Sequence, residues 1–473
     1  MDKNAAAIAD LTHFLGSEAV AVGTDAAKWS QDWTGNYRWT PLCVARPANT
    51  QGVAAVLRIA SAHGLPIVPV SGNTGLSGGT VAEGAIMLSV DRMNHIREIR
   101  RDSRIMVVEA GVILSEIHVA AEAEGLVFPL TFGARGSARI GGCLATNAGG
   151  SNVLRYGNVR ALCLGIEVVL PSGDVLDLMS AVHKDNSGYD LRDLFIGAEG
   201  TLGVITAAVL RLFPRPRAYA TAMVAAAHMG DGLRILNRLQ EQTGGMVEAF
   251  EYMPRHYVET HLKYDAAARE PFGDPHDINL LVELGATSPD DAEPGRDGVI
   301  PVVRRLEDIL GDLMEQGLVL DATLARSEAQ RSEMWARREA AAELTVTQPH
   351  VVINDIALPL ERVPEFLDRA IPALREIDPC VRDFVVSHLG DGNVHYNIWP
   401  STDDAAQHER LREKIEDLVA EMRGSFSAEH GIGTSRIGSM IRRKDPVALQ
   451  TMRAIRRAID PSGLMNPGKT IPE

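Results

Sequence analysis

Three glycine-rich segments in the first half of the chain constrain its fold more than any other feature. They are "PVSGNTGLSGGT" (69–80), "FPLTFGARGSARIGGCLATNAGG" (128–150) and "NSGYDLRDLFIGAEGTLGVIT" (186–206). The first follows the apolar run "LPIVPV", which predicts a strand. Glycine allows sharp turns and lets several N–H groups point at one anion, so this loop suits a pyrophosphate. One such loop could be an ordinary connection, but three exceed what turns alone require.

The spacing of these glycines argues against the commonest nucleotide-binding motifs. The chain contains neither the GxGxxG fingerprint of nicotinamide dinucleotide domains nor the GxxxxGK[ST] loop of nucleoside triphosphate domains. The glycine-rich loops therefore predict a phosphate-bearing ligand held in another way.

Length and composition limit the remaining possibilities. A chain of 473 residues exceeds what one hydrophobic core organises, so we expect two or three lobes. The formal net charge of −15 argues against a nucleic-acid partner. No run approaches the roughly 18 apolar residues of a membrane span, and the N-terminus lacks the features of a secretory signal. The cysteines have no CxxC spacing, which favours free thiols and a reducing, cytoplasmic compartment; they are Cys43, Cys143, Cys163 and Cys380.

The pattern along the chain predicts an α+β protein with three parts. From about residue 40 to 217, short β-branched runs alternate with glycine-rich turns. The prolines of "RLFPRPRA" indicate the exit from this first domain, which we place at residues 1–217. Longer helical patterns and strands then alternate through 218–424, and residues 425–473 form a C-terminal segment.

The segment "SHLGDGNVHYN" carries the first candidate catalytic groups. His388 and His395 are seven residues apart, and Gly390 and Gly392 flank Asp391 between them, which argues against a helix. A hairpin with arms "RDFVVSH" and "VHYNIW" would bring the two imidazoles together. A single histidine is more often a satisfied core residue than a ligand, and an Asp between glycines is more often part of a turn.

A second segment, "SAEHGIGT", adds Glu429 and His430. Two imidazoles and the carboxylate of Glu429 form a donor set suited to Zn²⁺, Mn²⁺ or Fe²⁺, with positions left for a substrate. The sequence thus predicts a metal site in the second half of the chain.

Several motifs together resemble one known family. "SGNTGLSGG", "IGGCLATNAGG", "RYGNVR", "IGAEGTLGVIT" and "DPSGLMNPGK" are similar to the D-2-hydroxyacid dehydrogenase branch of the vanillyl-alcohol-oxidase-like (PCMH-type) flavoproteins. The likeness covers nearly the whole chain. It implies a two-subdomain FAD-binding lobe, a substrate-binding α+β cap with an antiparallel sheet, and a helical C-terminal segment that returns to the flavin.

The resemblance also implies which residues contact FAD. Four residues would wrap the pyrophosphate, six would line the flavin, three would lie near the adenine, and one would return from the C-terminus. In this order they are Gly72, Asn73, Thr74 and Gly75; Gly141, Gly142, Thr146, Asn147, Gly149 and Gly150; Gly200, Gly203 and Ile205; and Asn466, with Leu76, Ser77, Pro129, Gly136 and Ser137 as further cofactor contacts.

The sequence departs from related proteins in two places near these contacts. Cys143 stands where related sequences often carry Asn, which we interpret as a change in packing. The phosphate loop lacks the His or Cys to which some relatives attach the flavin, so we expect FAD to be bound non-covalently.

The resemblance assigns roles to the later motifs. Residues matching His388, His395 and Glu429 hold a divalent metal in related dehydrogenases, for which we expect Zn²⁺. The residue matching His430 removes the hydroxyl proton while a hydride leaves the α-carbon for flavin N5, a task suited to imidazole. Asn397 would hydrogen-bond the substrate.

A carboxylate substrate also needs a cation, and "MWARREAAAE" offers two arginines on a predicted helix. The "W-x-x-R-E" pattern of the family selects Arg338 over Arg337, although an arginine on a helix can also be simply solvated.

Two positions bear on substrate choice. Relatives that act on 2-hydroxyglutarate carry Lys and Thr where this chain has Ile353 and Ala342. A second carboxylate would lose both partners, so we expect a monocarboxylate such as D-lactate.

The predicted function is FAD- and metal-dependent oxidation of a D-2-hydroxyacid to a 2-oxoacid. Within this class, D-2-hydroxyglutarate or glycolate dehydrogenase is the alternative. A metal-dependent hydrolase would leave the glycine-rich loops unexplained, and a flavin-binding protein without turnover would leave the His/Glu cluster unexplained. Related enzymes pass their electrons to an electron-transfer flavoprotein, a quinone or a cytochrome, and no residue of this chain points to one of the three. A homodimer is the default assembly.

Overall fold

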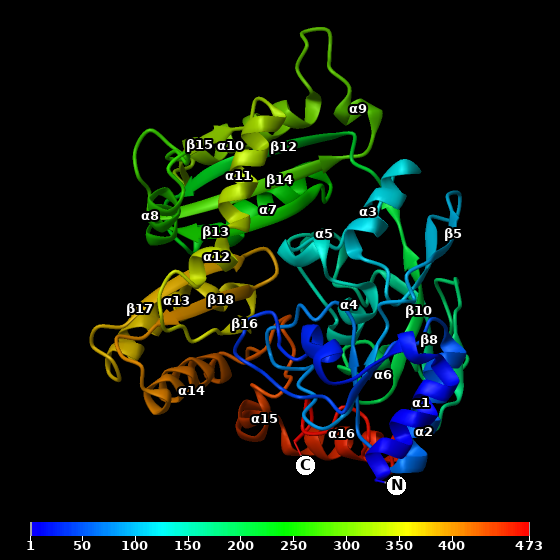
Figure 1. Ribbon diagram of the computed structural model, residues 1–473. Helices are drawn as coiled ribbons and strands as arrows, with labels where there is room; N and C mark the ends of the chain where they lie inside the picture. Colours follow the sequence, from blue (N-terminus) through cyan, green and yellow to red (C-terminus); the bar gives the residue numbers. More distant parts are fainter. Residues whose placement is uncertain (1, 473) are drawn as a thin grey trace.

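The first lobe contains two separate small sheets, in agreement with the two-subdomain lobe that the resemblance implies. A computed structural model describes residues 2–472 (Figure 1). The first sheet has the order β1-β2-β4-β3, with β2, β4 and β3 parallel and β1 antiparallel to β2. Its strands and the two helices that share its core are β1 (Val20–Ala21), β2 (Cys43–Ala45), β3 (Ile67–Val70), β4 (Ile86–Ser89), α1 (Lys3–Leu15) and α2 (Thr50–His63).

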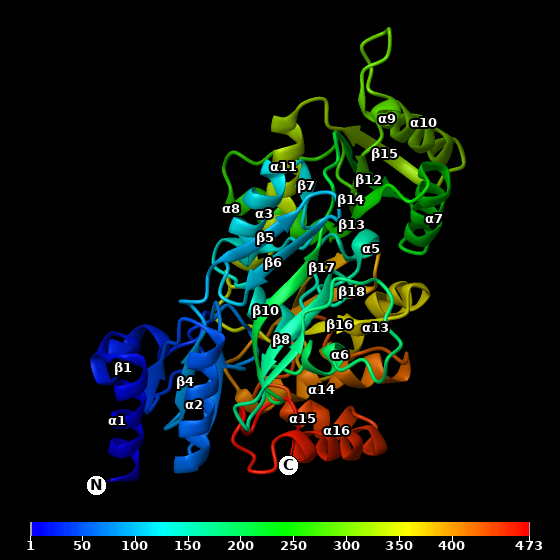
Figure 2. The same cartoon turned by 90° about the vertical axis from the view of Figure 1, so that its right-hand side faces the viewer.

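The second sheet of this lobe is antiparallel and has the order β5-β6-β10-β8-β9. Its central strand β10 is buried along seven of its eight residues, because α2 contacts it from one core and α4 from another. Figure 2 shows β8 and β10 running through the middle of the molecule. The elements are β5 (Ile96–Arg100), β6 (Ile105–Glu109), β8 (Cys163–Val169), β9 (Val175–Leu178), β10 (Val204–Arg211), α3 (Leu114–Ala123), α4 (Ile140–Thr146), α5 (Val153–Tyr156) and α6 (Arg192–Phe195), with the short pair β7 (Leu126–Val127) and β11 (Phe213–Pro214).

The cap is built on one antiparallel sheet of seven strands in the order β15-β12-β14-β13-β17-β18-β16. The strands are β12 (Ala218–Ala226), β13 (Val247–Pro254), β14 (Ile278–Ala286), β15 (Val319–Leu324), β16 (Asp355–Ala357), β17 (Arg382–His388) and β18 (Asn393–Trp399). Long apolar stretches in these strands agree with a sheet that is covered on both faces.

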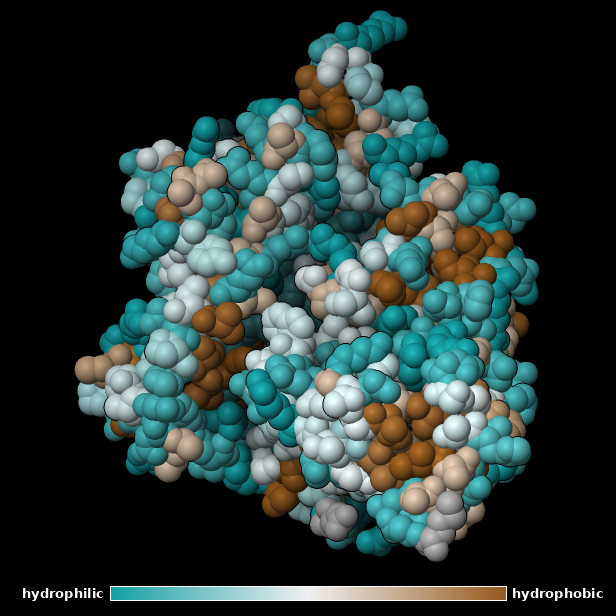
Figure 3. All heavy atoms as spheres, viewed as in Figure 1, coloured by the Kyte–Doolittle hydropathy of each residue, from teal (hydrophilic) through white to brown (hydrophobic). Residues whose placement is uncertain are grey.

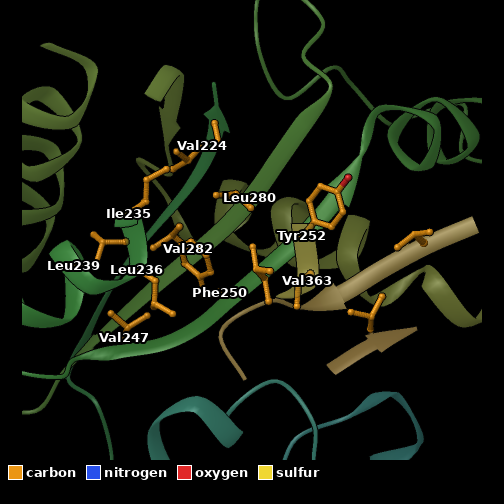
Figure 4. Packing of buried hydrophobic residues seen from close by; sticks show 14 of the residues in the cluster. Val224, Ile235, Leu236, Leu239, Val247, Phe250, Tyr252, Leu280, Val282 and Val363 are labelled. Atoms are coloured by element: carbon orange, nitrogen blue, oxygen red, sulfur yellow. The ribbon is translucent and has the colours of Figure 1, made fainter. Parts of the chain in front are cut away.

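Helices cover the two faces of the cap sheet unequally. One face packs against four amphipathic helices, and Figure 4 shows Ile235, Leu236 and Leu239 of α7 on that side. The other face packs against three shorter helices around Tyr257 and Phe384. The first group is α7 (Asp231–Thr243), α10 (Pro301–Glu315), α13 (Val363–Arg375) and α14 (Ala405–Glu421), and the second is α8 (Arg255–Tyr264), α11 (Glu328–Glu339) and α12 (Ala341–Thr345); α9 (Pro289–Ala292) precedes α10.

The C-terminal segment returns from the cap to the first lobe. Its helices are α15 (Ile437–Arg443) and α16 (Pro446–Ile459), which lie below the first lobe in Figures 1 and 2. Met465 pairs in parallel with Ile67 of β3, so the chain end extends the first sheet. Four short 3₁₀ helices complete the described structure: η1 (Ser17–Ala19), η2 (Gly23–Trp29), η3 (Gly133–Gly136) and η4 (Leu360–Arg362).

The predicted α+β class, the antiparallel cap sheet and the helical C-terminal segment are confirmed. The proposed boundary at 217 lies between β11 and β12, and the one at 424 follows α14. All four cysteines are free, and burial raises the pKa of Cys143 to about 12, which suits a packing residue. Between residues 2 and 472, the structure has no helix of the length and apolarity that a membrane span needs.

Gly433 provides a test of how the C-terminal segment docks. Its φ is +51°, and a Cβ there would lie 2.0 Å from the carbonyl oxygen of Ser77. We expect Gly433→Ala to lower the free energy of unfolding by about 1–3 kcal/mol, because backbone on both sides must shift. Gly230→Ala is the matched control, since a Cβ at that position meets no atom within 4 Å. Equal unfolding midpoints for the two variants in a urea titration would contradict this account.

Candidate active site between the two lobes

The predicted hairpin forms the centre of the candidate site. Strands β17 and β18 pair antiparallel, with Val386 opposite His395 and His388 opposite Asn393. His388 and His395 therefore point to the same face of the sheet, and their ring centroids are 5.3 Å apart. At the turn, Gly392 has a φ of +81°, and a Cβ there would lie 2.2 Å from the carbonyl oxygen of Leu358.

Glu429 approaches both imidazoles from the C-terminal segment. Its Oε1 lies 4.0 Å from Nε2 of His388 and 3.6 Å from Nε2 of His395. Its Oε2 accepts the backbone N–H of Gly150 at 2.9 Å, in the second glycine-rich segment. One carboxylate thus connects the histidine pair in the cap with a glycine loop of the first lobe.

The spacing of these three side chains fits a metal. Zn–N and Zn–O bonds of about 2.1 Å in a tetrahedron separate the ligand atoms by about 3.4 Å. The two N–O separations of 3.6 and 4.0 Å are close to this value. Burial also holds the pKa of His395 well below its ordinary value, which keeps this imidazole in the neutral form that binds metals.

Glu251 fixes His388 from behind. Both carboxylate oxygens of Glu251 lie 2.9 Å from Nδ1 of His388, which leaves Nε2 directed at Glu429. Burial alone would raise the pKa of Glu251, but His388 and Arg338 outweigh it and keep the pKa low. The same carboxylate raises the pKa of His388 against the opposing effect of burial. A carboxylate behind a histidine ligand is the usual arrangement of a metal site.

Arg338 lies beside this pair at the end of α11. It is 7% exposed, and its Nε donates to Glu251 at 2.6 Å. Its Nη2 lies 3.4 Å from both ring nitrogens of His388. The neighbouring Arg337 instead donates to the carbonyl oxygen of Arg269, so the two predicted candidates face different surroundings.

Asn397 lies two residues beyond His395 on the same strand. Its Nδ2 donates to Oγ1 of Thr345 at 3.1 Å, while its Oδ1 is buried without a hydrogen-bond partner. Such an orphaned acceptor is costly unless a ligand satisfies it. The amide is therefore held in place and has one acceptor atom available to a ligand.

His430 lies between the cap and the first glycine-rich loop. Its ring stacks on His395 with centroids 5.5 Å apart, and its carbonyl oxygen accepts the hydroxyl of Ser77 at 3.1 Å. The predicted base is thus brought next to the predicted metal ligands.

Two of the three glycine-rich segments touch each other. A Cβ on Gly72 would lie 2.5 Å from the carbonyl oxygen of Ser137, and one on Gly142 would lie 3.1 Å from Cβ of Ser71. By contrast, Cβ atoms on Gly75 and Gly136 would meet nothing within 4 Å. The first two glycines bring the loops together, and the other two leave backbone open to a ligand.

The remaining predicted cofactor residues follow the same loops. Gly141, Gly150 and Gly203 lie so close to neighbouring backbone that they serve packing as well. The first loop between β3 and β4 holds Gly72, Asn73, Thr74, Gly75, Leu76 and Ser77; the second, from β7 through α4 to α5, holds Pro129, Gly136, Ser137, Gly141, Gly142, Thr146, Asn147, Gly149 and Gly150; Gly200 and Gly203 precede Ile205 of β10; and Asn466 follows α16.

Orphaned polar atoms support a bound group along these loops. Oγ of Ser71 and Oδ1 of Asn466 are buried without partners. Nδ2 of Asn466 donates to the carbonyl oxygens of Gly79 and Glu199, so the C-terminal segment joins the first and third glycine-rich segments. The residues present therefore fit an elongated, polar cofactor such as FAD.

Sequence reasoning missed four polar residues that support the site. Thr345 holds Asn397, Glu251 holds His388, and Glu199 accepts the N–H groups of Ile432 and Gly433 at 2.9 and 2.8 Å. Asp355 is the fourth, and one ligand atom each of Asp355, His395, Glu429 and His430 lie within 4.8 Å of one another. No sequence motif identifies these four residues. Only the alternation of side chains along the strand "INDIALPL" indicates which residues share a sheet face with Asp355.

The site lies at a hollow in the surface. Figure 3 shows this hollow at the centre of the face, where Figure 1 shows β16 and α12 of the cap opposite α4 and α5 of the first lobe. A substrate can therefore reach the space between the two lobes.

The sequence profile of the family "FAD linked oxidases, C-terminal domain" matches residues 215–470, and that of "FAD binding domain" matches residues 41–179. D-2-hydroxyglutarate dehydrogenase from Bos taurus mitochondria is 36% identical over 93% of this chain and 79% of its own. The D-2-hydroxyglutarate dehydrogenase of Xanthomonas citri pv. viticola is 35% identical over 94% of this chain and 92% of its own.

Solved structures show the same fold at low sequence identity. p-Cresol methylhydroxylase with substrate bound superposes with a TM-score of 0.75 at 16% identity, covering 99% of this chain and 96% of that one. 4-Ethylphenol oxidase from Gulosibacter chungangensis gives a TM-score of 0.73 at 18% identity, covering 99% and 97%. The chain belongs to the FAD-linked oxidase family and is an FAD-dependent oxidoreductase.

Proposed function

We propose that this member of the FAD-linked oxidase family oxidises a D-2-hydroxyacid to a 2-oxoacid, using non-covalent FAD and a divalent metal, Zn²⁺, as its cofactors. One observation carries the proposal. The carboxylate of Glu429 faces the imidazoles of His388 and His395 with one oxygen and accepts an N–H from the flavin-binding loop with the other. Metal chemistry and flavin chemistry would therefore meet at one substrate.

Each side chain has a distinct task in this reaction. FAD held by the glycine-rich loops would supply the acceptor for the hydride of the substrate α-carbon, and a metal held by His388, His395 and Glu429 would supply polarisation of the hydroxyl group. Arg338 holds the substrate carboxylate through guanidinium N–H groups that Glu251 does not occupy, and Asn397 hydrogen-bonds the substrate. His430 removes the hydroxyl proton. The electrons of the O–H bond then form the carbonyl double bond as the hydride leaves the α-carbon.

We propose a monocarboxylate substrate, such as D-lactate, because of Ile353. Asp355 pairs with His395 and Val352 pairs with Ile398, so the same register sets Ile353 opposite Asn397. Side chains alternate along a strand, and Ile353 thus shares the face of Asp355 and His395. An apolar side chain next to Asn397 offers no partner to a second carboxylate. Ala342 is exposed on α12, so its bearing on the substrate is weaker.

D-2-hydroxyglutarate is the second candidate, because curated relatives at 31–36% identity carry that name. The electron acceptor would be an electron-transfer flavoprotein, a quinone or a cytochrome. The cytoplasmic location and the homodimer stay predictions.

A screen of flavin reduction under anaerobic conditions tests the proposal. The purified protein is mixed with D- and L-enantiomers of lactate, malate, 2-hydroxyglutarate and glycerate and with glycolate. We expect D-enantiomers to bleach the flavin absorption bands of the protein and L-enantiomers to leave these bands unchanged. A spectrum that no hydroxyacid changes would refute the proposed reaction.

The metal ligands give the next test. His388→Ala and His395→Ala should each release the metal and abolish turnover while FAD stays bound, because the flavin loops belong to the other lobe. Metal content is measured by atomic emission and FAD content by the visible spectrum. His95→Ala is the control, since its side chain is 76% exposed in the first lobe. Full turnover of either variant without detectable metal would disprove the metal role.

The proposed base is tested with His430→Asn. This variant should keep metal and FAD but slow flavin reduction by about two to four orders of magnitude, the usual contribution of a positioned base. The rate is measured by stopped-flow absorbance at saturating substrate. An unchanged rate would remove His430 from proton transfer.

Substrate selection is tested at Ile353. Leaving a carboxylate without a partner costs about 1–3 kcal/mol or more, so kcat/KM should favour D-lactate over D-2-hydroxyglutarate by about tenfold or more. Ile353→Lys should narrow this ratio, whereas Leu320→Lys, exposed on β15 at the far edge of the same sheet, should not. A wild-type preference for D-2-hydroxyglutarate would show that another cation serves the distal carboxylate.

A further inference from the structure

We propose that Asp355 is a positioning residue whose single carboxylate orients both the metal ligand His395 and the base His430. The inference rests on the proposed function and adds to it a residue shared by metal binding and proton transfer. Asp355 begins β16, at the edge of the cap sheet that faces the C-terminal segment.

Three N–H groups fix the carboxylate of Asp355 in place. Oδ2 accepts the backbone N–H groups of Glu429 at 2.9 Å and of His430 at 2.8 Å. Oδ1 accepts Nδ2 of Asn393 at 2.8 Å, from the first residue of β18. The side chain is fully buried, and charge-assisted hydrogen bonds of this kind hold a carboxylate rigidly.

Both imidazoles turn their Nδ1 atoms toward this carboxylate. Nδ1 of His395 lies 3.6 Å from Oδ1, and Nδ1 of His430 lies 3.7 Å from Oδ2. Nδ1 of His430 is buried without a hydrogen-bond partner. The two rings stack with an angle of 19° between their planes, so they are presented in parallel. Nε2 of His395 is left facing Glu429.

The surroundings favour an ionised Asp355. Its carboxylate accepts three N–H groups and donates none, as an anion does. Nη1 of Arg436 lies 3.9 Å from Oδ2. A fixed anion behind two imidazoles favours the tautomer with the proton on Nδ1, which leaves Nε2 free to bind metal in His395 and to accept a proton in His430.

A direct role of Asp355 as metal ligand is the competing interpretation. Its oxygens lie close enough to those of Glu429 and to the two histidines for such a site. However, three N–H donors already occupy the carboxylate, and the ring nitrogens facing it are the Nδ1 atoms. His388, His395 and Glu429 can bind a metal without breaking these hydrogen bonds or turning the rings.

Asp355→Asn separates these possibilities. Asp355 accepts hydrogen bonds with both carboxylate oxygens, whereas an Asn side chain has one oxygen and one NH₂ group. In the variant, the NH₂ group therefore faces N–H donors that an oxygen faced before. FAD-loaded protein is stripped of metal with a chelator and titrated with Zn²⁺ by calorimetry. We expect the affinity for Zn²⁺ to fall about 10- to 100-fold, the usual cost of losing an orienting partner. Loss of all measurable binding would make Asp355 a ligand, and unchanged affinity would refute its action on His395.

The action on His430 needs a kinetic measurement. At saturating Zn²⁺, Asp355→Asn should slow flavin reduction by about tenfold or more with little change in KM, because proton removal and not substrate binding is affected. In the His430→Asn background the same substitution should change the rate by less than about threefold. Additive losses in the double variant would show that Asp355 does not act through His430.

Asp383→Asn is the matched control. Asp383 lies on β17, which β18 separates from β16. It also accepts a hydrogen bond, from the hydroxyl of Tyr396 at 2.9 Å, and faces the opposite side of the sheet. It should leave Zn²⁺ affinity and the reduction rate unchanged. If no hydroxyacid reduces the flavin, the calorimetric titration still decides the role of Asp355 toward His395, so failure of this inference and failure of the proposed reaction give different results.

Discussion

The irregular backbone of residues 425–434 lies mostly half-buried between the two lobes, and carboxylates from both sides accept its N–H groups. Asp355 of the cap accepts those of Glu429 and His430, and Glu199 of the first lobe accepts those of Ile432 and Gly433. Unpaired N–H groups in such a place would each cost about 1–3 kcal/mol. These two carboxylates therefore allow the loop that carries the candidate ligand and base to stay in one conformation, in contact with both halves of the molecule.

Charges are also buried around His388, and this has a stability cost. Glu251 and Arg338 are both nearly inaccessible to solvent, and removing two charges from water costs several kcal/mol per ion before their attraction is counted. Apolar side chains of the same volume in place of Glu251, Arg338 and His388 would stabilise the fold as well or better. In return, Glu251 aligns Nε2 of His388 and at the same time restrains the guanidinium of Arg338.

The sequence predicts best those parts of the site whose signals are local. The β17–β18 hairpin follows from two alternating strands around a Gly-Asp-Gly turn, and the glycine-rich loops follow from composition alone. The orienting carboxylates could not be predicted in this way. In the chain, Asp355 is 74 residues from its partner Glu429, Glu251 is 137 residues from His388, and Glu199 is 233 residues from Ile432. Each lies in a largely apolar run, and only the tertiary fold reveals its partner.

The balance of buried charge supplies a last argument about the substrate. Glu251 already accepts one N–H of Arg338. The remaining N–H groups of the guanidinium lie beside His388, where they can hold one carboxylate. A second carboxylate would need a second cation on the face shared by His395, Asn397 and Ile353, and the strand residue opposite Asn397 is apolar. Identity of about a third along the chain is compatible with this difference, because fold and cofactor loops involve many residues whereas one or two decide whether a distal charge is accepted. The balance of charge at the site therefore agrees with the proposed monocarboxylate substrate.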